Sequence, residues 1–438
     1  MARPTVVAVK LFAGPGWSLK QMVEFTHKCE VLVVGAGPAG MAAACRAAEV
    51  SSSVTVVDDN SNPGGQIWRQ QQAHPDSSVA SAWFEKIRAS QLEFINNARV
   101  FQAVNHDTLL AETDDGVVEL KYSKLVLAPG ARERFLPFPG WTLPNVVGAG
   151  GLQALVKSGF SVGAKRVVVA GSGPLLLAVA AYLRQHGAEI VLIAEQAQAA
   201  KLVKFGIGLF GLQRKRSQAL RLRKELKGLK YSTSCWPVAA QGTDKLTSVT
   251  LRQRGRLETI SCDFLAYGYH LIPNLELPVL IGCALKNKFV QVNEYQEASI
   301  PNTYCAGEVT GIGGLELSLV EGEIAGLAVT GRRDEARDLF AFRSRQRKFA
   351  SLLNQTFALR DELKDLPRPD TLLCRCEDVP YNTVCQYSSW REAKLQTRCG
   401  MGPCQGRICG GALQFLVDWD VDSVRPPVLP VRVESLIM

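Results

Sequence analysis

The stretch EVLVVGAGPAG, residues 30–40, decides the fold of this chain. A short apolar run leads into Gly35, Gly37 and Gly40, and an alanine-rich stretch from Met41 to Ala48 follows. In a strand–turn–helix unit that binds a dinucleotide, the first glycine permits the tight turn, the second lets pyrophosphate approach, and the third lets helix and strand pack closely. Amide groups at the start of the helix then face the phosphates. The pattern predicts that a dinucleotide contacts the three glycines together with Ala36, Pro38 and Ala39.

An acidic residue lies where this type of site needs one. The next apolar strand, SVTVVDD, reaches Asp58, and a carboxylate at that distance accepts hydrogen bonds from a ribose. A lone glycine motif is weak evidence, but strand, helix and acid occur here in the expected order. A glycine-rich turn without a ligand is the remaining alternative.

A second glycine motif lies in RVVVAGSGPLLLAVAAYLRQHGAEIVLIAEQ, residues 166–196. Gly171 and Gly173 occupy the first two glycine positions, and Glu195 ends the following strand. The third position is Leu176, which we expect to hold helix and strand further apart and to crowd a diphosphate. Two interpretations stay open: a degenerate site for NAD or an adenine nucleotide, or a nucleotide fold retained for its structure.

Four cysteines near the C-terminus form two close pairs. Cys374 and Cys376 are separated by one residue, and Cys399 and Cys404 by a glycine-rich turn. Structural zinc sites usually leave two to four residues between paired cysteines, so the first pair disfavours zinc. Two such pairs suit an iron–sulfur cluster. Buried thiols or two disulfides are the alternatives.

The segments TLLCRCEDV and TRCGMGPCQGRICG resemble the small helical [2Fe-2S] module of bacterioferritin-associated ferredoxins. The variant they resemble is fused to flavoproteins, in the larger subunits of opine oxidases, hydroxyproline dehydrogenases and bacterial hydrogen cyanide synthase. The resemblance implies that the ligands are Cys374, Cys376, Cys399 and Cys404. Cys409 and Cys385 fall outside the pattern, and we expect both to be packed thiols.

Three further segments resemble glutathione-reductase-like flavoproteins. LVLAPGAR (125–132) and NTYCAGEV (302–309) are apolar strands ending in small residues, and PGGQIW (63–68) is similar to a flavin-side loop. The resemblance implies FAD at the first site. Glu308 stands where the family usually has Asp, so the extra methylene shifts the carboxylate that faces the ribityl chain. The other implied contacts are Gly65, Gln66, Ala128, Gly130 and Gly307.

These motifs predict an α/β protein with two Rossmann-like dinucleotide-binding domains, the second inserted in the first, plus a small helical [2Fe-2S] domain. Pro367 and Pro369 mark the last linker. The predicted divisions are an N-terminal extension (1–28), an FAD-binding domain (29–144 and 276–330), a second nucleotide-binding domain (145–275), a helical linker (331–369), and the cluster domain with its tail (370–438). Met22 is an alternative first residue.

Charge and hydropathy limit the possible partners. The net charge is +9, and much of the excess lies in residues 201–230. No aromatic residues are interleaved there for base stacking, so we expect no nucleic acid. No apolar run reaches spanning length, and the cysteine spacing is not that of a disulfide scaffold. We therefore expect a cytoplasmic protein without a transmembrane span, or one peripheral to the inner face of the membrane.

The favoured hypothesis is the larger subunit of a heteromeric FAD-dependent dehydrogenase or oxidase acting on C–N bonds of amino acids, imino acids or opines. The resemblance implies a smaller flavoprotein partner, a small third subunit, FMN at a subunit interface, and a downstream electron acceptor. Residues 58–100 contain no cysteine, unlike the flavin-side segment of disulfide reductases. A self-sufficient NAD(P)H-dependent reductase and a redox-responsive scaffold are the alternatives.

Overall fold

The computed structural model describes residues 25–72, 77–209, 213–420 and 424–436. Its first sheet has the strand order β3-β2-β1-β6-β5-β4, and β19 pairs with β6. β1, β2, β3, β6 and β19 run parallel, and β4, β5 and β6 form an antiparallel meander. The bounds are β1 (Phe25–Val34), β2 (Val54–Val57), β3 (Glu93–Ile95), β4 (Arg99–Asn105), β5 (Thr108–Thr113), β6 (Gly116–Leu127) and β19 (Thr303–Cys305).

Alternation along β1 gives this sheet two apolar faces. Val31 and Val33 pack with α1 (Pro38–Ala48) and α8 (Leu315–Val329), whereas Leu32 and Val34 pack on the opposite face. Helix α8 lies against α1 closely enough that a Cβ at Gly322 would approach the Ala39 carbonyl oxygen to 2.1 Å. α2 (Ser78–Ala89) covers the outer side of α1. These helices hold the glycine-rich turn before α1 in place.

The second sheet is all-parallel, with the order β11-β10-β9-β15-β8. One face is covered by α3 and α4, and the other by the antiparallel sheet β12-β13-β14. The bounds are β8 (Val146–Gly148), α3 (Ala149–Lys157), β9 (Arg166–Ser172), α4 (Leu175–Gln185), β10 (Glu189–Glu195), α5 (Ala199–Gly208), α6 (Gln213–Glu225), β11 (Tyr231–Thr233), β12 (Cys235–Gln241), β13 (Ser248–Gln253), β14 (Arg256–Ser261) and β15 (Phe264–Tyr269).

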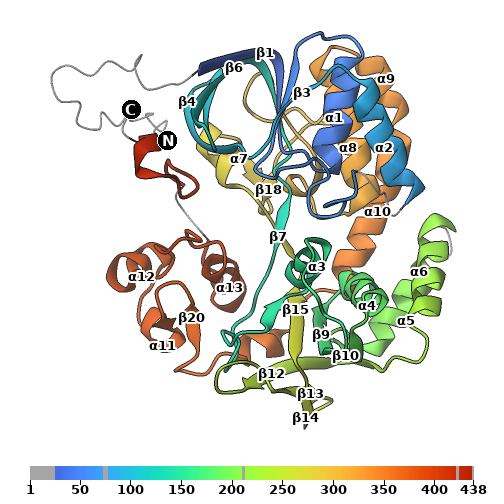
Figure 1. The fold of residues 1–438 in the computed structure, drawn as a ribbon, viewed down its shortest axis with the longest axis vertical. Helices are drawn as coiled ribbons and strands as arrows, with labels where there is room; N and C mark the ends of the chain where they lie inside the picture. The colour runs from blue at the N-terminus through green and yellow to red at the C-terminus, as the bar shows by residue number, and fades with distance from the viewer. Residues whose placement is uncertain (1–24, 73–76, 210–212, 421–423, 437–438) are drawn as a thin grey trace.

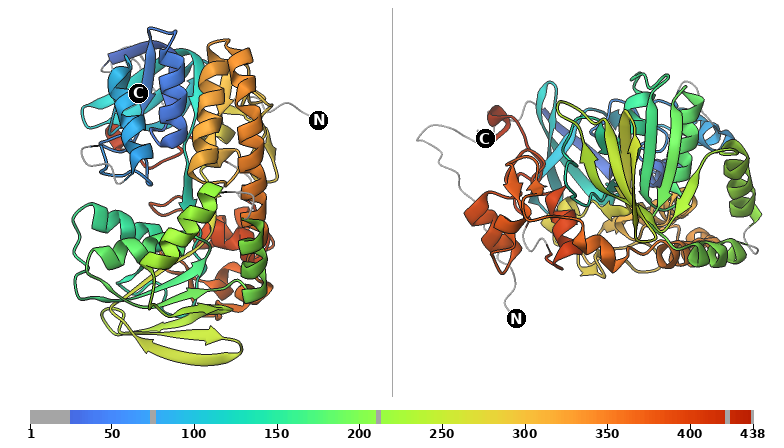
Figure 2. Two further views of the ribbon diagram at one scale, coloured as in Figure 1. Left: turned by 90° about the vertical axis from the view of Figure 1, so that its right-hand side faces the viewer. Right: turned by 90° about the horizontal axis from the view of Figure 1, so that it is seen from below.

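Two short strands join the sheets. β7 (Ala131–Glu133) leaves the first sheet, and β16 (Leu271–Pro273) returns antiparallel to it. Beyond this crossing lie α7 (Glu276–Ile281), β17 (Leu285–Lys286), β18 (Phe289–Val290), α9 (Arg333–Asp338) and α10 (Phe340–Thr356). Figure 1 and the left view of Figure 2 show the first sheet above and the second below. Helix α10 extends from the first unit toward the second.

The C-terminal region is mainly helical and has its own core around Val384, Trp390 and Leu413. It lies to one side of the two sheets (Figure 1). Its elements are β20 (Leu372–Cys374), β21 (Val379–Pro380), α11 (Tyr381–Val384), α12 (Trp390–Thr397) and α13 (Cys409–Leu416). The predicted fold class, two Rossmann-like units with a helical C-terminal region, is confirmed.

The first strand begins inside the predicted N-terminal extension. β1 starts at Phe25, within residues 1–28, and Met22 lies outside the described residues. Within the described residues, no helix combines the length and apolar character needed to cross a bilayer.

Candidate functional site

The first glycine-rich turn has the geometry that its sequence predicts. Gly35 has a φ of +104°, and a Cβ there would lie 2.2 Å from the Ala128 carbonyl oxygen. A Cβ at Gly40 would lie 1.7 Å from the Gly35 carbonyl oxygen, so both positions require glycine. A Cβ at Gly37 would meet no atom within 4 Å. The turn therefore packs tightly on its protein side and leaves Gly37 facing open space, as a diphosphate requires.

Asp58 forms hydrogen bonds with the backbone of this turn and of the loop after β2. Its side chain is buried, and one carboxylate oxygen accepts a hydrogen bond from the Ala36 amide at 2.5 Å. The other accepts one from the Asn60 amide at 2.8 Å. The loop that carries Gly65 and Gln66 lies over the turn, where a Cβ at Gly65 would approach Gly37 Cα to 2.9 Å and the Gln66 side chain is exposed.

Glu308 has an unsatisfied oxygen. Gly307, with a φ of +81°, lies so close to α1 that a Cβ there would approach Ala39 Cβ to 2.8 Å. The Glu308 side chain reaches the N-cap residue of α8, Gly314, whose amide donates a hydrogen bond to its Oε1 at 3.0 Å. Its Oε2 is buried and has no hydrogen-bond partner among the described residues. Burial raises the pKa of Glu308 to about 7.

The residues of the first site fit FAD. A buried carboxylate oxygen without a partner is costly unless a ligand donates to it. A ribityl hydroxyl is a suitable donor, so the longer Glu308 retains an acceptor for it. Ala128 is buried where β6 ends, and Gly130, with a φ of +69°, has open space at its Cβ position.

In the second glycine-rich turn, contacts within the chain already use the groups that would bind a nucleotide. A Cβ at Gly171 would lie 1.9 Å from the Gly268 carbonyl oxygen, whereas Gly173 has open space. Glu195 is buried, and its carboxylate accepts hydrogen bonds from the amides of Gly173 and Ala197, both at 2.8 Å. Burial raises the pKa of Glu195 to about 7. Leu176 is buried in the core between α4 and the sheet, so it packs where the motif expects glycine.

A segment distant in sequence covers the edge where a nucleotide would bind. The Phe357 carbonyl oxygen accepts hydrogen bonds from Ser172 Oγ at 2.9 Å and from Gln196 Nε2 at 3.2 Å. His270 Nε2 lies 2.5 Å from the same oxygen. Ser172 ends β9, and Gln196 and His270 follow β10 and β15, so all three lie at the carboxyl edge that binds ligands in open α/β sheets. The motif itself gave no signal of this contact, because Phe357 lies 185 residues beyond Ser172.

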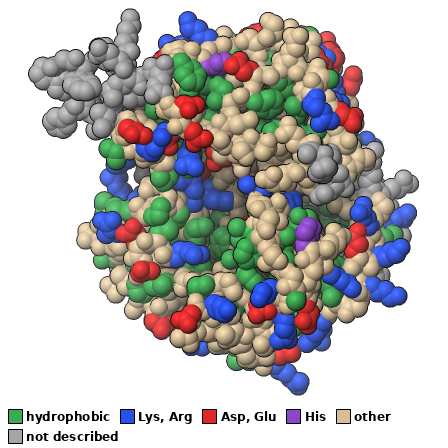
Figure 3. Space-filling model, viewed as in Figure 1, with side chains coloured by type: hydrophobic (Ala, Val, Ile, Leu, Met, Phe, Trp, Pro, Cys, Tyr) green, Lys and Arg blue, Asp and Glu red, His purple; other side chains and the backbone are tan. Residues whose placement is uncertain are grey.

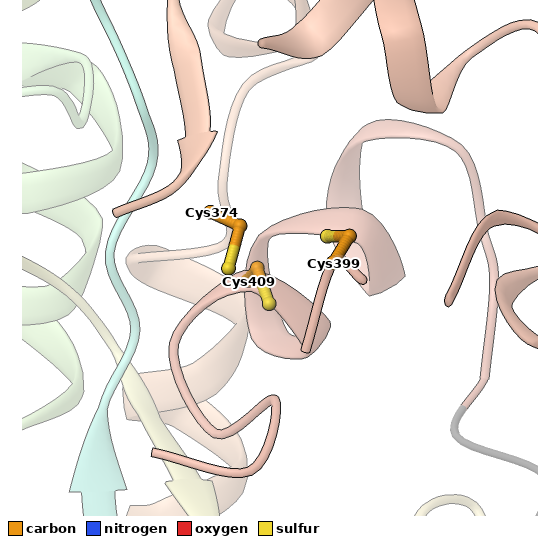
Figure 4. A group of neighbouring side chains, drawn as sticks. All are labelled: Cys374, Cys399 and Cys409. Carbon is orange, nitrogen blue, oxygen red and sulfur yellow. The ribbon is translucent and has the colours of Figure 1, made fainter. Parts of the chain in front are cut away.

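The C-terminal cysteines form two groups. The sulfurs of Cys374, Cys399 and Cys409 are buried and lie within 4.8 Å of one another (Figure 4). The thiols of Cys376 and Cys404 are partly buried and contact each other. Hydrogen bonds from the Cys399 and Cys409 thiols, and from the Gly400 amide, hold the pKa of Cys374 well below its usual range. The same contacts raise the pKa of Cys399 and of Cys409, so the geometry is the firmer observation: buried, converging sulfurs fit an iron–sulfur centre.

Cys409 and Cys385 were both predicted to be packed thiols. Cys409 is buried as predicted, and it also begins α13 and brings its sulfur to the Cys374–Cys399 pair. Only its proximity to Cys404 in the sequence hinted at this. Cys385, also expected to be packed, is exposed just after α11. That expectation was wrong because α11 ends at Val384 and turns the next side chain outward.

Residues 398–408 join α12 to α13 and carry Cys399 and Cys404. This segment, the cysteine loop, docks against the strand that leaves the first sheet. Arg132, on β7, donates from Nε to the Arg407 carbonyl oxygen at 3.3 Å and forms an ion pair with Glu276 at 3.0 Å. Arg407 lies 3.7 Å from the same Glu276 carboxylate. Trp141 Nε1 also donates to the Leu372 carbonyl oxygen at 2.6 Å, just before Cys374. Charged and backbone contacts therefore fix the sulfur groups beside the segment that follows Gly130.

Comparison with known proteins agrees with this geometry. A family model described as pyridine nucleotide-disulphide oxidoreductase matches residues 29–330. The chain is 31% identical over 423 residues to hydrogen cyanide synthase subunit HcnB of Pseudomonas protegens, covering 87% of this chain and 90% of the relative. It is 28% identical to an opine oxidase subunit of Rhizobium meliloti, covering 93% of this chain and 87% of that relative.

Solved structures show the same fold at low identity. The L-proline dehydrogenase from P. horikoshii superposes with a TM-score of 0.67 at 17% identity, covering 95% of this chain and 81% of that chain. The thioredoxin reductase of T. acidophilum superposes with a TM-score of 0.52 at 20% identity, covering 69% and 98%. Because the first of these structures covers 95% of this chain, the similarity extends beyond residue 330, where the family model ends.

Proposed function

Because the chain belongs to the pyridine nucleotide-disulphide oxidoreductase family, it is an FAD-dependent oxidoreductase, and we propose that it is the larger subunit of a heteromeric dehydrogenase. Two of its relatives are named as subunits of hydrogen cyanide synthase and opine oxidase. Their names support a substrate whose C–N bond is oxidised: an amino acid, an imino acid or an opine. On this proposal a smaller flavoprotein subunit, with or without a small third subunit, completes the substrate site.

The proposed cofactors are FAD and a [2Fe-2S] cluster. A flavin accepts two electrons together and releases them singly, and a [2Fe-2S] cluster accepts one. The turn at Gly35–Gly40 would hold the diphosphate, Glu308 would accept a ribityl hydroxyl, and the C-terminal cysteines would hold the iron. We retain Cys374, Cys376, Cys399 and Cys404 as the proposed ligands.

On this proposal electrons pass from a partner flavin through FAD and the [2Fe-2S] cluster to a respiratory acceptor. One observation carries this electron relay: the cysteine loop is docked on the strand that follows the proposed flavin site. Arg132 lies two residues after Gly130 and binds the Arg407 carbonyl oxygen, three residues after Cys404. Both Arg132 and Arg407 face the carboxylate of Glu276. A cluster that served folding alone would not require this contact with the proposed flavin site.

The second nucleotide unit supports electron entry from a partner rather than from NADH. The Phe357 carbonyl oxygen accepts hydrogen bonds from Ser172 and Gln196 at the ligand edge of this unit. NAD bound at this edge would have to displace these contacts. An adenine nucleotide that uses only the open space beside Gly173 remains part of the proposal.

A surface cavity is our candidate for the additional FMN at a subunit interface. Its volume is about 580 Å³, within the range of small-molecule sites. It opens between α8 and α10, and its wall includes Thr310 and Gly311, which follow Glu308 closely in the chain. Arg347, half-exposed at the same wall, offers a cation for a phosphate although it is paired with Glu321 at 2.8 Å.

Anaerobic reduction tests the proposal. We expect NADH or NADPH to leave the flavin of the purified chain oxidised, and a C–N substrate to reduce it only when the partner subunit is present. Rapid bleaching by NADH without a partner would instead support the self-sufficient reductase. Full turnover of a reconstituted complex carrying Cys374→Ser, with no iron bound, would support the redox-responsive scaffold.

A further inference from the structure

The helical hairpin formed by α5 and α6 holds the positive charge of the whole chain. Residues 199–230, the basic hairpin, contain ten of the 50 Lys and Arg residues and one of the 41 Asp and Glu residues. The remainder of the chain has 40 of each and is electrically neutral. Figures 1 and 2 place both helices at one edge of the molecule, beside α10. The net positive charge of the chain therefore comes from this one segment.

One side of the hairpin is anchored to the protein. The Phe205 ring packs against Phe357 with a centroid distance of 5.4 Å. Lys215 forms an ion pair with Glu316 at 2.5 Å and lies 4.8 Å above the ring of Phe349. These contacts fix the orientation of both helices, so the opposite side faces solvent.

The solvent side combines apolar and basic side chains. Val203 and Ile207, one turn apart on α5, are 64% and 63% exposed, and Leu220 on α6 is 58% exposed. Lys201, Lys204 and Arg216 are exposed among them. The one acidic residue, Glu225, is paired with Arg221 at 2.8 Å. Lys and Arg gather at the right-hand edge of Figure 3, where Figure 1 draws α6.

We propose that the basic hairpin docks the protein on the surface of an anionic lipid bilayer. Exposed aliphatic side chains flanked by lysine and arginine on a helix are typical of interfacial helices, which place the apolar residues at the headgroup boundary. Each basic residue near such a surface adds attraction to anionic lipid. A nucleic acid would be favoured by aromatic side chains for base stacking, and the exposed apolar residues here are aliphatic.

Flotation with vesicles tests this proposal on the full-length protein. We expect it to bind phosphatidylcholine vesicles containing phosphatidylglycerol, to ignore pure phosphatidylcholine vesicles, and to dissociate as salt is raised. Removing two charges with Lys201→Gln and Lys204→Gln should weaken binding about 25-fold, since each basic residue contributes about fivefold. Val203→Ser with Ile207→Ser should also weaken binding, through the lost apolar contact.

The turn after β13 and the first residues of β14 provide a matched control. Leu257 is 62% exposed and stands beside the exposed Arg254 and Arg256. A variant with Leu257→Ser, Arg254→Gln and Arg256→Gln removes similar groups elsewhere, and it should bind the vesicles like the parent. Unchanged melting temperatures verify that the variants fold.

Three results would overturn the proposal. They are no binding to phosphatidylglycerol vesicles at low salt, equal losses in the hairpin and control variants, and a hairpin-dependent affinity for single-stranded DNA or polyglutamate but not for vesicles. Binding is measured without substrate or electron acceptor. Its failure is therefore distinguishable from failure of the proposed dehydrogenase function.

Discussion

Substituting Glu308 by Gln should make the FAD-free protein more stable at alkaline pH. Burial raises the pKa of this carboxyl from 4.5 to about 7, so the folded chain holds the proton more tightly than the unfolded chain does. The stability from this group is complete below pH 4.5 and falls as the pH rises through 7. A shift of that size corresponds to about 3 kcal/mol. The glutamine side chain of the variant would carry no charge and would still offer its amide oxygen to the Gly314 amide.

Urea unfolding at pH 5 and pH 8, followed by tryptophan fluorescence, measures the effect. We expect the Glu308→Gln variant to exceed the parent by up to about 3 kcal/mol at pH 8 and by little at pH 5. Glu195 adds a fall with pH in the same direction, but it does so in both proteins, so their difference isolates Glu308. The exposed Glu294 gives a control, Glu294→Gln. An equal change at both pH values would refute the reasoning.

The same variant should lose affinity for FAD. A hydrogen bond to a charged group contributes about 1.5–3 kcal/mol, so we expect the dissociation constant for FAD to rise by roughly 10- to 100-fold. Fluorescence titration of the FAD-free protein at pH 8 measures it. Unchanged affinity would mean that the unpaired Oε2 does not face the flavin.

Further predictions concern the cysteine loop and the second nucleotide unit. Arg132→Met should loosen the cysteine loop, because Arg132 binds Glu276 and the Arg407 carbonyl oxygen. Electron transfer between flavin and iron, measured by stopped-flow absorbance, should slow by at least severalfold. A rate equal to the parent's would contradict this. Cys399→Ser should reduce the iron and acid-labile sulfide retained after anaerobic purification, because Cys399 is a proposed ligand whose sulfur lies within 4.8 Å of two others. The exposed Cys385→Ser is the control, and equal retention in both variants would show that Cys399 only packs. NADH at millimolar concentration should not raise the melting temperature of the chain, since Phe357 already occupies the ligand edge. A clear rise in melting temperature would show that the nucleotide displaces Phe357.

Features set by neighbouring residues were predictable from the sequence. The constraint on Gly40 arises within one strand–turn–helix unit, where a Cβ would meet the Gly35 carbonyl oxygen, and the same turn gives Gly35 its positive φ. The spacing of the two glycines therefore predicted this turn, although the contact of Gly35 with Ala128 comes from a distant strand. The two Rossmann-like units followed from the glycine motifs, and the helical C-terminal region followed from the resemblance to the [2Fe-2S] module. Leu176 is buried where helix and strand pack, and its expected effect on a bound diphosphate stays a prediction.

Features set by distant residues were not predictable. The Phe357 carbonyl oxygen meets Ser172 only because α10 leads the chain from the first unit to the second, and nothing in either local sequence indicates the contact. The same holds for Arg132 and Arg407, which are 275 residues apart. The proximity of Cys409 to Cys374 depends on how α13 packs, and spacing counted along the chain does not show it.

The central claim is that the C-terminal sulfurs hold an iron–sulfur cluster coupled to the flavin. Anaerobic titration of the purified chain with dithionite, followed by absorbance and electron paramagnetic resonance, tests it most directly. The account predicts iron and acid-labile sulfide in equal amounts, and a reduced-cluster signal that appears together with flavin bleaching. Zinc in place of iron, or a bleached flavin without any cluster signal, would contradict it.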